Sequence, residues 1–145
     1  MALLSNKKAY FDYEIIEKLE AGIELLGAEV KSLRAGLGSL LGGRVMPRGG
    51  EAYLVGATIP PYQIANASKD YDPSRNRRLL LTKKQIAILT SVEKEKGLTI
   101  VPISVYNKGK KIKVEIGIAR GKKKFDKRET TKKRESERDI RRMMK

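Results

Sequence analysis

The last 26 residues of the chain, residues 120–145, limit what it can fold into more than any other feature. They contain 13 lysines and arginines against 5 aspartates and glutamates, and no large apolar residue lies between Asp126 and Asp139. Such a segment has no face to bury, so we expect it to stay disordered until a partner orders it. The sequence therefore predicts one folded domain over residues 1–119 and a basic tail over residues 120–145.

Composition excludes most enzyme classes. The chain of 145 residues has no cysteine and no histidine, so it lacks a thiolate nucleophile, a disulfide framework and the commonest general base and metal ligand. We expect a protein without enzymatic activity, cofactor or metal site. Two acidic pairs, Asp70 with Asp72 and Glu14 with Glu17, leave a metal-dependent nuclease as the enzyme alternative.

The net charge of +15 and a pI near 10.1 indicate a polyanionic partner. Nucleic acid and an anionic membrane are the two candidate partners. The alternative is a charged surface that only keeps the protein soluble. A membrane-bound helix needs bulky apolar anchors, but the tail has few and the chain has no tryptophan. The first residues are too short for a signal peptide, and no run reaches the roughly 18 apolar residues of a membrane span. We therefore expect a cytoplasmic protein that binds nucleic acid and no membrane.

Hydrophobic periodicity predicts short strands with two helices among them. One strand is ambiguous, because Glu14 and Lys18 at i,i+4 spacing also fit a helix. Thr82 and Gln85 form a capping-box pattern at the start of the second helix. The predicted elements are a bent strand at 13–25, a helix at 27–36, a hairpin of 40–46 and 52–59 turning at 47–50, a helix at 82–97, and strands at 98–101 and 112–118 turning at 107–109.

Five or six short strands joined by tight turns, with no β-α-β alternation, predict an antiparallel, barrel-like α+β domain. Gly22, Gly56 and Gly117 interrupt strand patterns, as the bends and close backbone approaches of a small closed barrel require. Loosely packed strands are the alternative explanation for these glycines.

Two basic clusters lie beside flat or apolar side chains, which is how phosphate contacts and base stacking are combined. Lys7 and Lys8 precede aromatic residues, and a predicted surface loop over residues 60–78 ends in Arg75, Arg77 and Arg78. The alternative is charge on a solvated face. The run 79–81 is Leu-Leu-Leu, which cannot all face one core. At least one of these leucines either packs under the second helix or forms an exposed apolar contact.

Several blocks together resemble the bacterial SsrA-binding protein family, whose members are the partners of transfer-messenger RNA in ribosome rescue. The Glu-Val-Lys-Ser-Leu-Arg block and the Gly-Lys-Lys plus Asp-Lys-Arg pair are the most specific. The matching blocks lie at residues 6–9, 20–23, 27–36, 72–75, 79–81, 96–99, 119–123 and 126–128.

The resemblance implies an oligonucleotide-binding-type β-barrel with flanking helices and two RNA surfaces. The barrel of the family grips the tRNA-like part of transfer-messenger RNA, and Asn6, Glu20, Arg34 and Leu80 match those positions. Together with the basic clusters, the expected RNA-binding residues are Asn6, Lys7, Lys8, Glu20, Lys31, Arg34, Arg75, Arg77, Arg78 and Leu80.

The resemblance also implies that the tail becomes helical in the empty messenger channel of a stalled ribosome, at the small-subunit decoding centre. The matching tail positions are Gly121, Lys122, Lys123, Phe125, Asp126, Lys127 and Arg128. The chain would then be a non-enzymatic adaptor for trans-translation, monomeric in its complex. A general structured-RNA-binding barrel, such as a ribosomal protein or RNA chaperone, is the alternative.

The sequence departs from the family pattern at three places. Phe125 stands where the family often has His or Tyr, so ring stacking is kept but a hydrogen bond is not. Phe11 replaces a frequent His. The segment 42–44, Gly-Gly-Arg, stands where the family tends to show Asp-Ser-Tyr, and an unusual turn follows it at 46–50.

Overall fold

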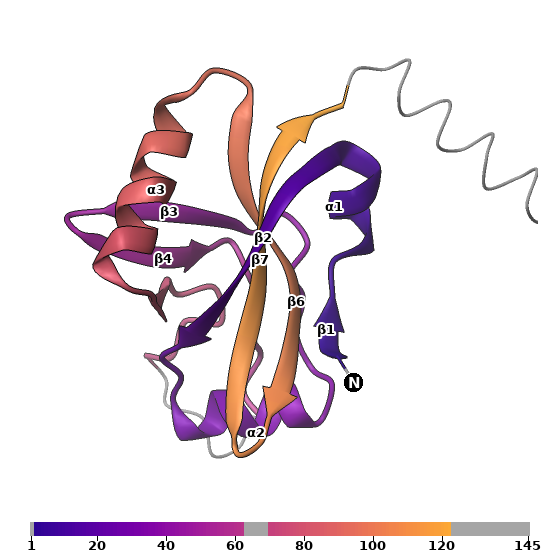
Figure 1. The fold of residues 1–145 in the computed structure, drawn as a ribbon. Coiled ribbons are helices and arrows are strands. Elements are labelled where there is room, and N and C mark those ends of the chain that lie inside the picture. The colour runs from indigo at the N-terminus through magenta and orange to yellow at the C-terminus, as the bar shows by residue number, and fades with distance from the viewer. Residues whose placement is uncertain (1, 63–69, 123–145) are drawn as a thin grey trace, which may run out of the picture.

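The computed structural model describes residues 2–62 and 70–122, which form a seven-stranded sheet and three helices (Figure 1). The elements run in the order β1 (Ala2–Ser5), α1 (Lys7–Asp12), β2 (Tyr13–Ile23), α2 (Gly27–Arg34), β3 (Arg44–Arg48), β4 (Glu51–Val55), β5 (Arg77–Leu80), α3 (Lys83–Lys94), β6 (Leu98–Lys108) and β7 (Lys111–Gly121). The α+β class and the two predicted helices are confirmed. The strand β1 and the short helix α1 were not predicted.

The sheet has the order β1-β6-β7-β2-β5-β4-β3, and every neighbouring pair is antiparallel. The two ends of this order, β1 and β3, do not pair among the described residues, so the predicted closed barrel is wrong. Helix α3 packs against both β3 and β6. Helix α3 therefore covers the β3 end of the sheet, and no hydrogen bonds between described strands close it.

The long strands β2, β6 and β7 form the centre of the sheet. Strand β2 pairs with β7 from Tyr13 opposite Gly121 to Gly22 opposite Lys113. A Cβ atom added to Gly117 on β7 would lie 2.7 Å from Cδ1 of Ile103, closer than real contacts allow. The side chains of Ile103 and Ile15 thus pack closely over Gly117, which fits a close approach better than loosely packed strands.

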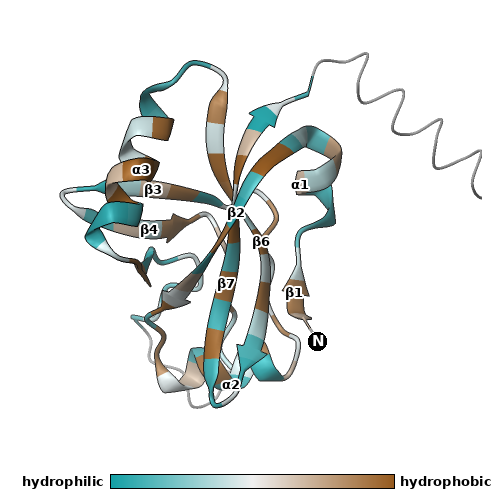
Figure 2. Ribbon diagram, in the orientation of Figure 1, coloured by the Kyte–Doolittle hydropathy of each residue, from teal (hydrophilic) through white to brown (hydrophobic). Residues whose placement is uncertain are grey.

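The core lies between the sheet and the helices. It includes Leu33 of α2, Leu54 of β4, Leu79 of β5, Leu89 of α3 and Val114 of β7, all fully buried. Figure 2 shows hydrophobic and hydrophilic residues alternating along β2 and β7, which is the pattern of a sheet with one buried face. No helix among the described residues is long and apolar enough to cross a membrane.

Local sequence signals account for the ends of these elements. The Thr82 hydroxyl accepts from the Gln85 backbone N–H, and the Gln85 side chain accepts from the Thr82 N–H, so α3 begins with the predicted capping box. Helix α2 ends where Gly36 adopts a φ of 78°, and the Gly36 and Leu37 amides donate back to the last turn. The β3–β4 hairpin turns at Gly49 and Gly50, again as predicted.

Candidate nucleic-acid interface

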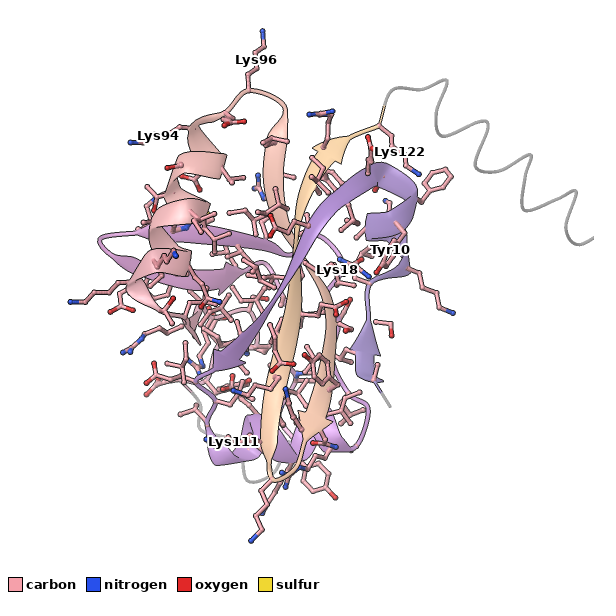
Figure 3. The ribbon with its side chains drawn as sticks, viewed as in Figure 1. Tyr10, Lys18, Lys94, Lys96, Lys111 and Lys122 are labelled. Atoms are coloured by element: carbon pink, nitrogen blue, oxygen red, sulfur yellow. The ribbon has the colours of Figure 1, made fainter. Side chains whose placement is uncertain are left out.

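A groove of about 310 Å³ lies where the end of β2, helix α2, the end of β5 and the β6–β7 turn meet. We call it the basic groove, because four of its side chains are cationic and the rest of its lining is apolar. Its lining residues are Gly22, Ile23, Leu25, Val30, Arg34, Leu80, Lys110, Lys111, Ile112 and Lys113. Figure 3 labels Lys111 at this end of the molecule, opposite Lys96.

Leu80 supplies an exposed apolar side chain to the basic groove. Its neighbour Leu79 is completely buried, whereas 47% of Leu80 is exposed, because successive residues of β5 point to opposite faces. Leu80 pairs with Gly22 of β2, and a Cβ atom on Gly22 would lie 3.1 Å from Cβ of Leu80. Of the two predicted possibilities for the leucine run, Leu80 thus forms the exposed contact.

Arg34 joins α2 to the β6–β7 turn. Its Nη2 atom donates a hydrogen bond of 3.0 Å to the carbonyl of Lys110. This bond holds the turn beside α2, so that Lys110, Lys111 and Lys113 line one groove with Arg34. The three lysines were not among the predicted RNA-binding residues, although the sequence shows their charge at the predicted turn. Only the fold reveals that α2 lies against them.

A shallower hollow continues from the basic groove along α2. It has a volume of about 520 Å³ and is lined by Lys31, Arg34, Ala35 and Tyr62. Lys31 and Arg34 lie in the last turn of α2, where the helix dipole favours positive charge. Cations thus line both hollows, and side chains of this kind contact the phosphates of a polynucleotide.

Glu20 is an acid on β2 near the groove, opposite Glu115 of β7. Its carboxylate accepts hydrogen bonds from the Tyr106 hydroxyl and from Nζ of Lys108, the latter at 2.9 Å. The bond from Tyr106, followed by that from Lys108, lowers the pKa of Glu20 below its usual value. Glu20 is therefore a fixed, ionised acceptor that can take hydrogen bonds from base amino and imino groups.

The predicted placement of Arg77 on an exposed basic loop is wrong, because Arg77 begins β5 and its side chain is completely buried. Its Nη2 atom lies 2.7 Å from Oε2 of Glu29, which is also buried, and Arg75 donates to both oxygens of Glu29. Arg77 further donates to the carbonyls of Ala57 and Pro73. The cluster fastens the start of β5 and the segment before it to α2.

The Glu29 carboxylate is ionised despite its burial. Burial by itself would raise the pKa of Glu29, but hydrogen bonds from Arg75, the Leu26 backbone N–H and Arg77 lower it to about 2. Sequence reasoning missed this cluster because arginine is seldom fully buried, and the partners are 48 residues apart. Of the three predicted arginines, Arg78 is exposed, and it is paired with Glu24 and Glu51.

Asn6, Lys7 and Lys8 lie at the opposite end of β2. Asn6 is buried, and its Nδ2 atom donates a hydrogen bond of 2.9 Å to the Pro102 carbonyl. It therefore fixes the start of α1 on β6. Lys7 and Lys8 are exposed, and Lys8 lines a second hollow of about 340 Å³ with Arg44. The predicted RNA-binding residues thus divide between two ends of the domain.

Of the predicted tail residues, two lie within the described part of the chain. Gly121 is the last residue of β7 and pairs with Tyr13. The Lys122 amide donates to the Asp12 carbonyl at 2.9 Å, and its Nζ atom donates to the Tyr10 carbonyl at 3.0 Å. The other predicted positions, Lys123, Phe125, Asp126, Lys127 and Arg128, lie outside the described residues. The expected boundary at residue 120 cuts through β7.

The acidic pairs do not form a metal centre in the part of the chain that the structure describes, where no three acidic side chains converge. The Asp72 carboxylate instead accepts from the Ser74 amide at 2.9 Å, which is the side-chain bond of a turn.

Comparisons with known proteins give one consistent result. Residues 3–145 match the family described as SmpB protein. The chain is 49% identical over 143 residues to the SsrA-binding protein of Gloeothece citriformis, covering 99% of this chain and 92% of that one. It is 53% identical over 136 residues to the SsrA-binding protein of a Sulfurihydrogenibium species, covering 94% and 89%. A solved structure described as "tmRNA-SmpB: a journey to the center of the bacterial ribosome" is 45% identical, with a TM-score of 0.70 over 83% of this chain and 85% of that chain.

Proposed function

The chain belongs to the SmpB protein family, and we propose that it is a non-enzymatic adaptor that binds transfer-messenger RNA and delivers it to stalled ribosomes for trans-translation. The observation that carries this proposal is the near-full-length match to SsrA-binding proteins. The basic groove provides a physical site for the RNA. Since ribosomes work in the cytoplasm, the protein would act there, as a monomer in the complex and without a cofactor.

We assign the tRNA-like part of transfer-messenger RNA to the basic groove and the hollow beside it. Lys31, Arg34, Lys110, Lys111 and Lys113 provide cations for phosphate oxygens. The exposed Leu80 side chain offers an apolar surface to a ribose or base, and the Glu20 carboxylate offers an acceptor to a base edge. Combined phosphate, apolar and acceptor contacts distinguish a shaped RNA from an arbitrary polyanion.

Asn6, Arg75 and Arg77 serve a different purpose in this proposal. Their polar atoms are engaged within the domain, by Pro102 and Glu29, so they support the RNA surface instead of contacting it. Lys7 and Lys8 are exposed at the far end, where they could contact a second polyanion. Arg78, which is exposed and paired with acids, stays a candidate for contact at the margin of the groove.

The segment after Lys122 takes the ribosomal part of the function in this proposal. Residues 123–145 would span roughly 35 Å as a helix, which is long enough to probe a messenger channel. Lys123, Lys127 and Arg128 would neutralise ribosomal RNA phosphates, while Phe125 would stack on a base at the decoding centre. A channel filled with messenger RNA would exclude the segment, so engagement would depend on an empty channel.

Competition binding tests the proposed function against a general RNA-binding protein. Labelled transfer-messenger RNA is bound to the full chain and displaced by its tRNA-like part or by an unrelated structured RNA of equal length. We expect the tRNA-like part to compete at least about tenfold better at physiological salt, since specific contacts add to the shared phosphate attraction. Equal competition would favour a general binder, such as a ribosomal protein or an RNA chaperone.

A further inference from the structure

Helix α1 ends next to the point where the chain leaves β7. The helix covers Lys7–Asp12, and the amide of Tyr13 donates to the Ala9 carbonyl. The carbonyls of the last turn that follow Ala9 have no intrahelical donor, as at every helix end, and they form its negative pole. Such groups need partners from elsewhere in the molecule or from water.

Lys122 supplies partners for two of these carbonyls. Its backbone N–H donates to the Asp12 carbonyl at 2.9 Å, and its Nζ atom donates to the Tyr10 carbonyl at 3.0 Å. One residue therefore extends the β2–β7 pairing by its backbone and binds the end of α1 by its side chain. Figure 3 shows Lys122 and Tyr10 on the same side of the molecule.

Tyr10 is held from a second direction. The Lys18 Nζ atom lies 5.3 Å from the centre of the Tyr10 ring, in cation–π distance, and 3.8 Å from a Glu115 carboxylate oxygen. The receiving end of α1 is thus fixed to β2 on one side while Lys122 binds it on the other. A fixed acceptor gives the Lys122 contact a defined direction.

We propose that Lys122 is a positioning residue that clips the start of the C-terminal segment to α1 and so fixes the direction in which this segment leaves the domain. Within the family resemblance Lys122 belongs to the tail motif that is expected to contact the ribosome. The geometry assigns it an intramolecular role instead. This inference rests on the proposed function, because it concerns the delivery of the tail.

Fixing the exit point has two physical consequences. The clip lies beside Tyr13, whereas the basic groove begins at Gly22, about 30 Å away along β2 at roughly 3.3 Å per residue. This exceeds the Debye length of about 8 Å at physiological salt, so RNA in the groove attracts the first tail residues only weakly. A fixed exit also raises the effective concentration of the segment near a target on that side.

The clip itself can be tested without the ribosome. In ¹⁵N NMR spectra of the full chain, we expect the Lys122 ammonium signal to be detectable by its slow exchange with water, and the Lys122 amide to be protected from hydrogen exchange. Lys122→Met should remove the first signal, and the exposed Lys111 should give no comparable signal in either protein. A Lys122 ammonium that exchanges as fast as that of Lys111 would overturn the proposal.

A covalent replacement separates positioning from ribosome contact. The chain has no cysteine, and the hydrogen bond of 2.9 Å from the Lys122 amide to the Asp12 carbonyl continues the pairing of Tyr13 with Gly121. Residues that lie opposite one another in this way have Cα atoms about 4.5–5.5 Å apart, within the roughly 4.4–6.8 Å that a disulfide needs. The double variant Asp12→Cys with Lys122→Cys therefore closes the clip when oxidised and opens it when reduced. The reduced form is the matched control.

The readouts are transfer-messenger RNA affinity and peptide tagging on ribosomes stalled without a stop codon. We expect Lys122→Met and the reduced double variant to tag on the order of tenfold more slowly, because the exit direction is then no longer fixed. Lys122→Arg should tag more like the wild type, and oxidation of the double variant should restore tagging. RNA affinity should be the same in all of them.

The outcomes also distinguish this inference from the proposed function. A wild-type chain that supports no tagging would refute the proposed function. Wild-type tagging with equal tagging by Lys122→Met would refute the clip, and so would a defect in the double variant that oxidation does not repair. The last result would show that the Lys122 ammonium itself contacts the ribosome.

Discussion

The Glu29 carboxylate and the Arg77 guanidinium form an ion pair of 2.7 Å in which neither side chain is exposed to solvent. Arg77 comes from β5 and Glu29 from α2, so the pair joins two elements that also border the basic groove. Removing one partner of such a pair leaves a buried charge without compensation. The stability of the domain and the shape of the basic groove are thus coupled through this pair.

Glu29→Gln should lower the free energy of unfolding by about 3 kcal/mol, because both arginines lose their counter-charge. Urea titration monitored by circular dichroism measures the change. Glu93→Gln is the control, since Glu93 pairs with Arg48 on the exposed surface and should cost about 0.5 kcal/mol or less. Equal effects of the two substitutions would show that the buried pair adds nothing to stability.

The same pair predicts how stability depends on pH. The folded-state pKa of Glu29 is about 2, below the ordinary value of 4.5. A depressed folded pKa adds to the free energy of unfolding above pH 4.5. This contribution, about 3 kcal/mol, is lost as the pH falls toward 2. Urea titrations between pH 6 and pH 2.5 should show this decline, and the Glu29→Gln variant should show a smaller one. Identical slopes for the two proteins would contradict the prediction.

Leu80→Asn should weaken binding of transfer-messenger RNA by about tenfold without unfolding the domain, because an exposed apolar contact to a base or ribose contributes roughly 1–3 kcal/mol. Ile16→Asn is a matched control, since Ile16 is also an exposed strand residue and lies outside the basic groove. Filter binding measures affinity, and thermal unfolding monitors the fold. An effect of Ile16→Asn as large as that of Leu80→Asn would contradict a specific role for the groove.

Reversing two charges in the groove tests its phosphate contacts. Lys111→Glu with Lys113→Glu should reduce RNA affinity, and should make the slope of log affinity against log salt shallower by about 1 for each phosphate that the protein no longer neutralises. Lys94→Glu with Lys96→Glu changes the same net charge at the other end of the molecule (Figure 3). We expect the control to keep most of the affinity. Equal reductions would indicate attraction by overall charge alone.

The sequence predicts those parts of the fold that local signals determine. The capping box at Thr82, the left-handed glycine at Gly36 and the turn at Gly49 each act over a few residues, and each is observed. Helix α1 gave no such signal, because its six residues are too few for periodicity and only Ala9 is buried. Its stability comes from contacts with distant residues such as Pro102 and Lys122.

The candidate site was predicted only in part, because its residues come together through contacts between distant parts of the chain. Alternation implied that at least one residue of the leucine run points outward, but only the packing of Leu79 into the core decides that Leu80 is exposed. Few aliphatic residues, a turn signal and three close arginines placed Arg77 on a surface loop, because nothing local to it shows that Glu29 lies beside it. The charge of a sequence locates a basic segment, but only the fold shows which of its cationic side chains form ion pairs within the domain.

The end of β7 determines where the tail can be removed. Truncation after Lys122 keeps every residue of the sheet, so we expect RNA affinity within about twofold of the full chain, apart from a shallower salt slope. Peptide tagging should be abolished.

Truncation after Ala119 also removes Arg120 and Gly121, which pair with Glu14 and Tyr13. That shorter chain should be less stable, because the ends of β2 and β6 lose backbone hydrogen bonds. Thermal unfolding, RNA binding and tagging assays on both truncations would check this order. Full tagging by the chain ending at Lys122 would contradict the assignment of the ribosomal role to residues 123–145.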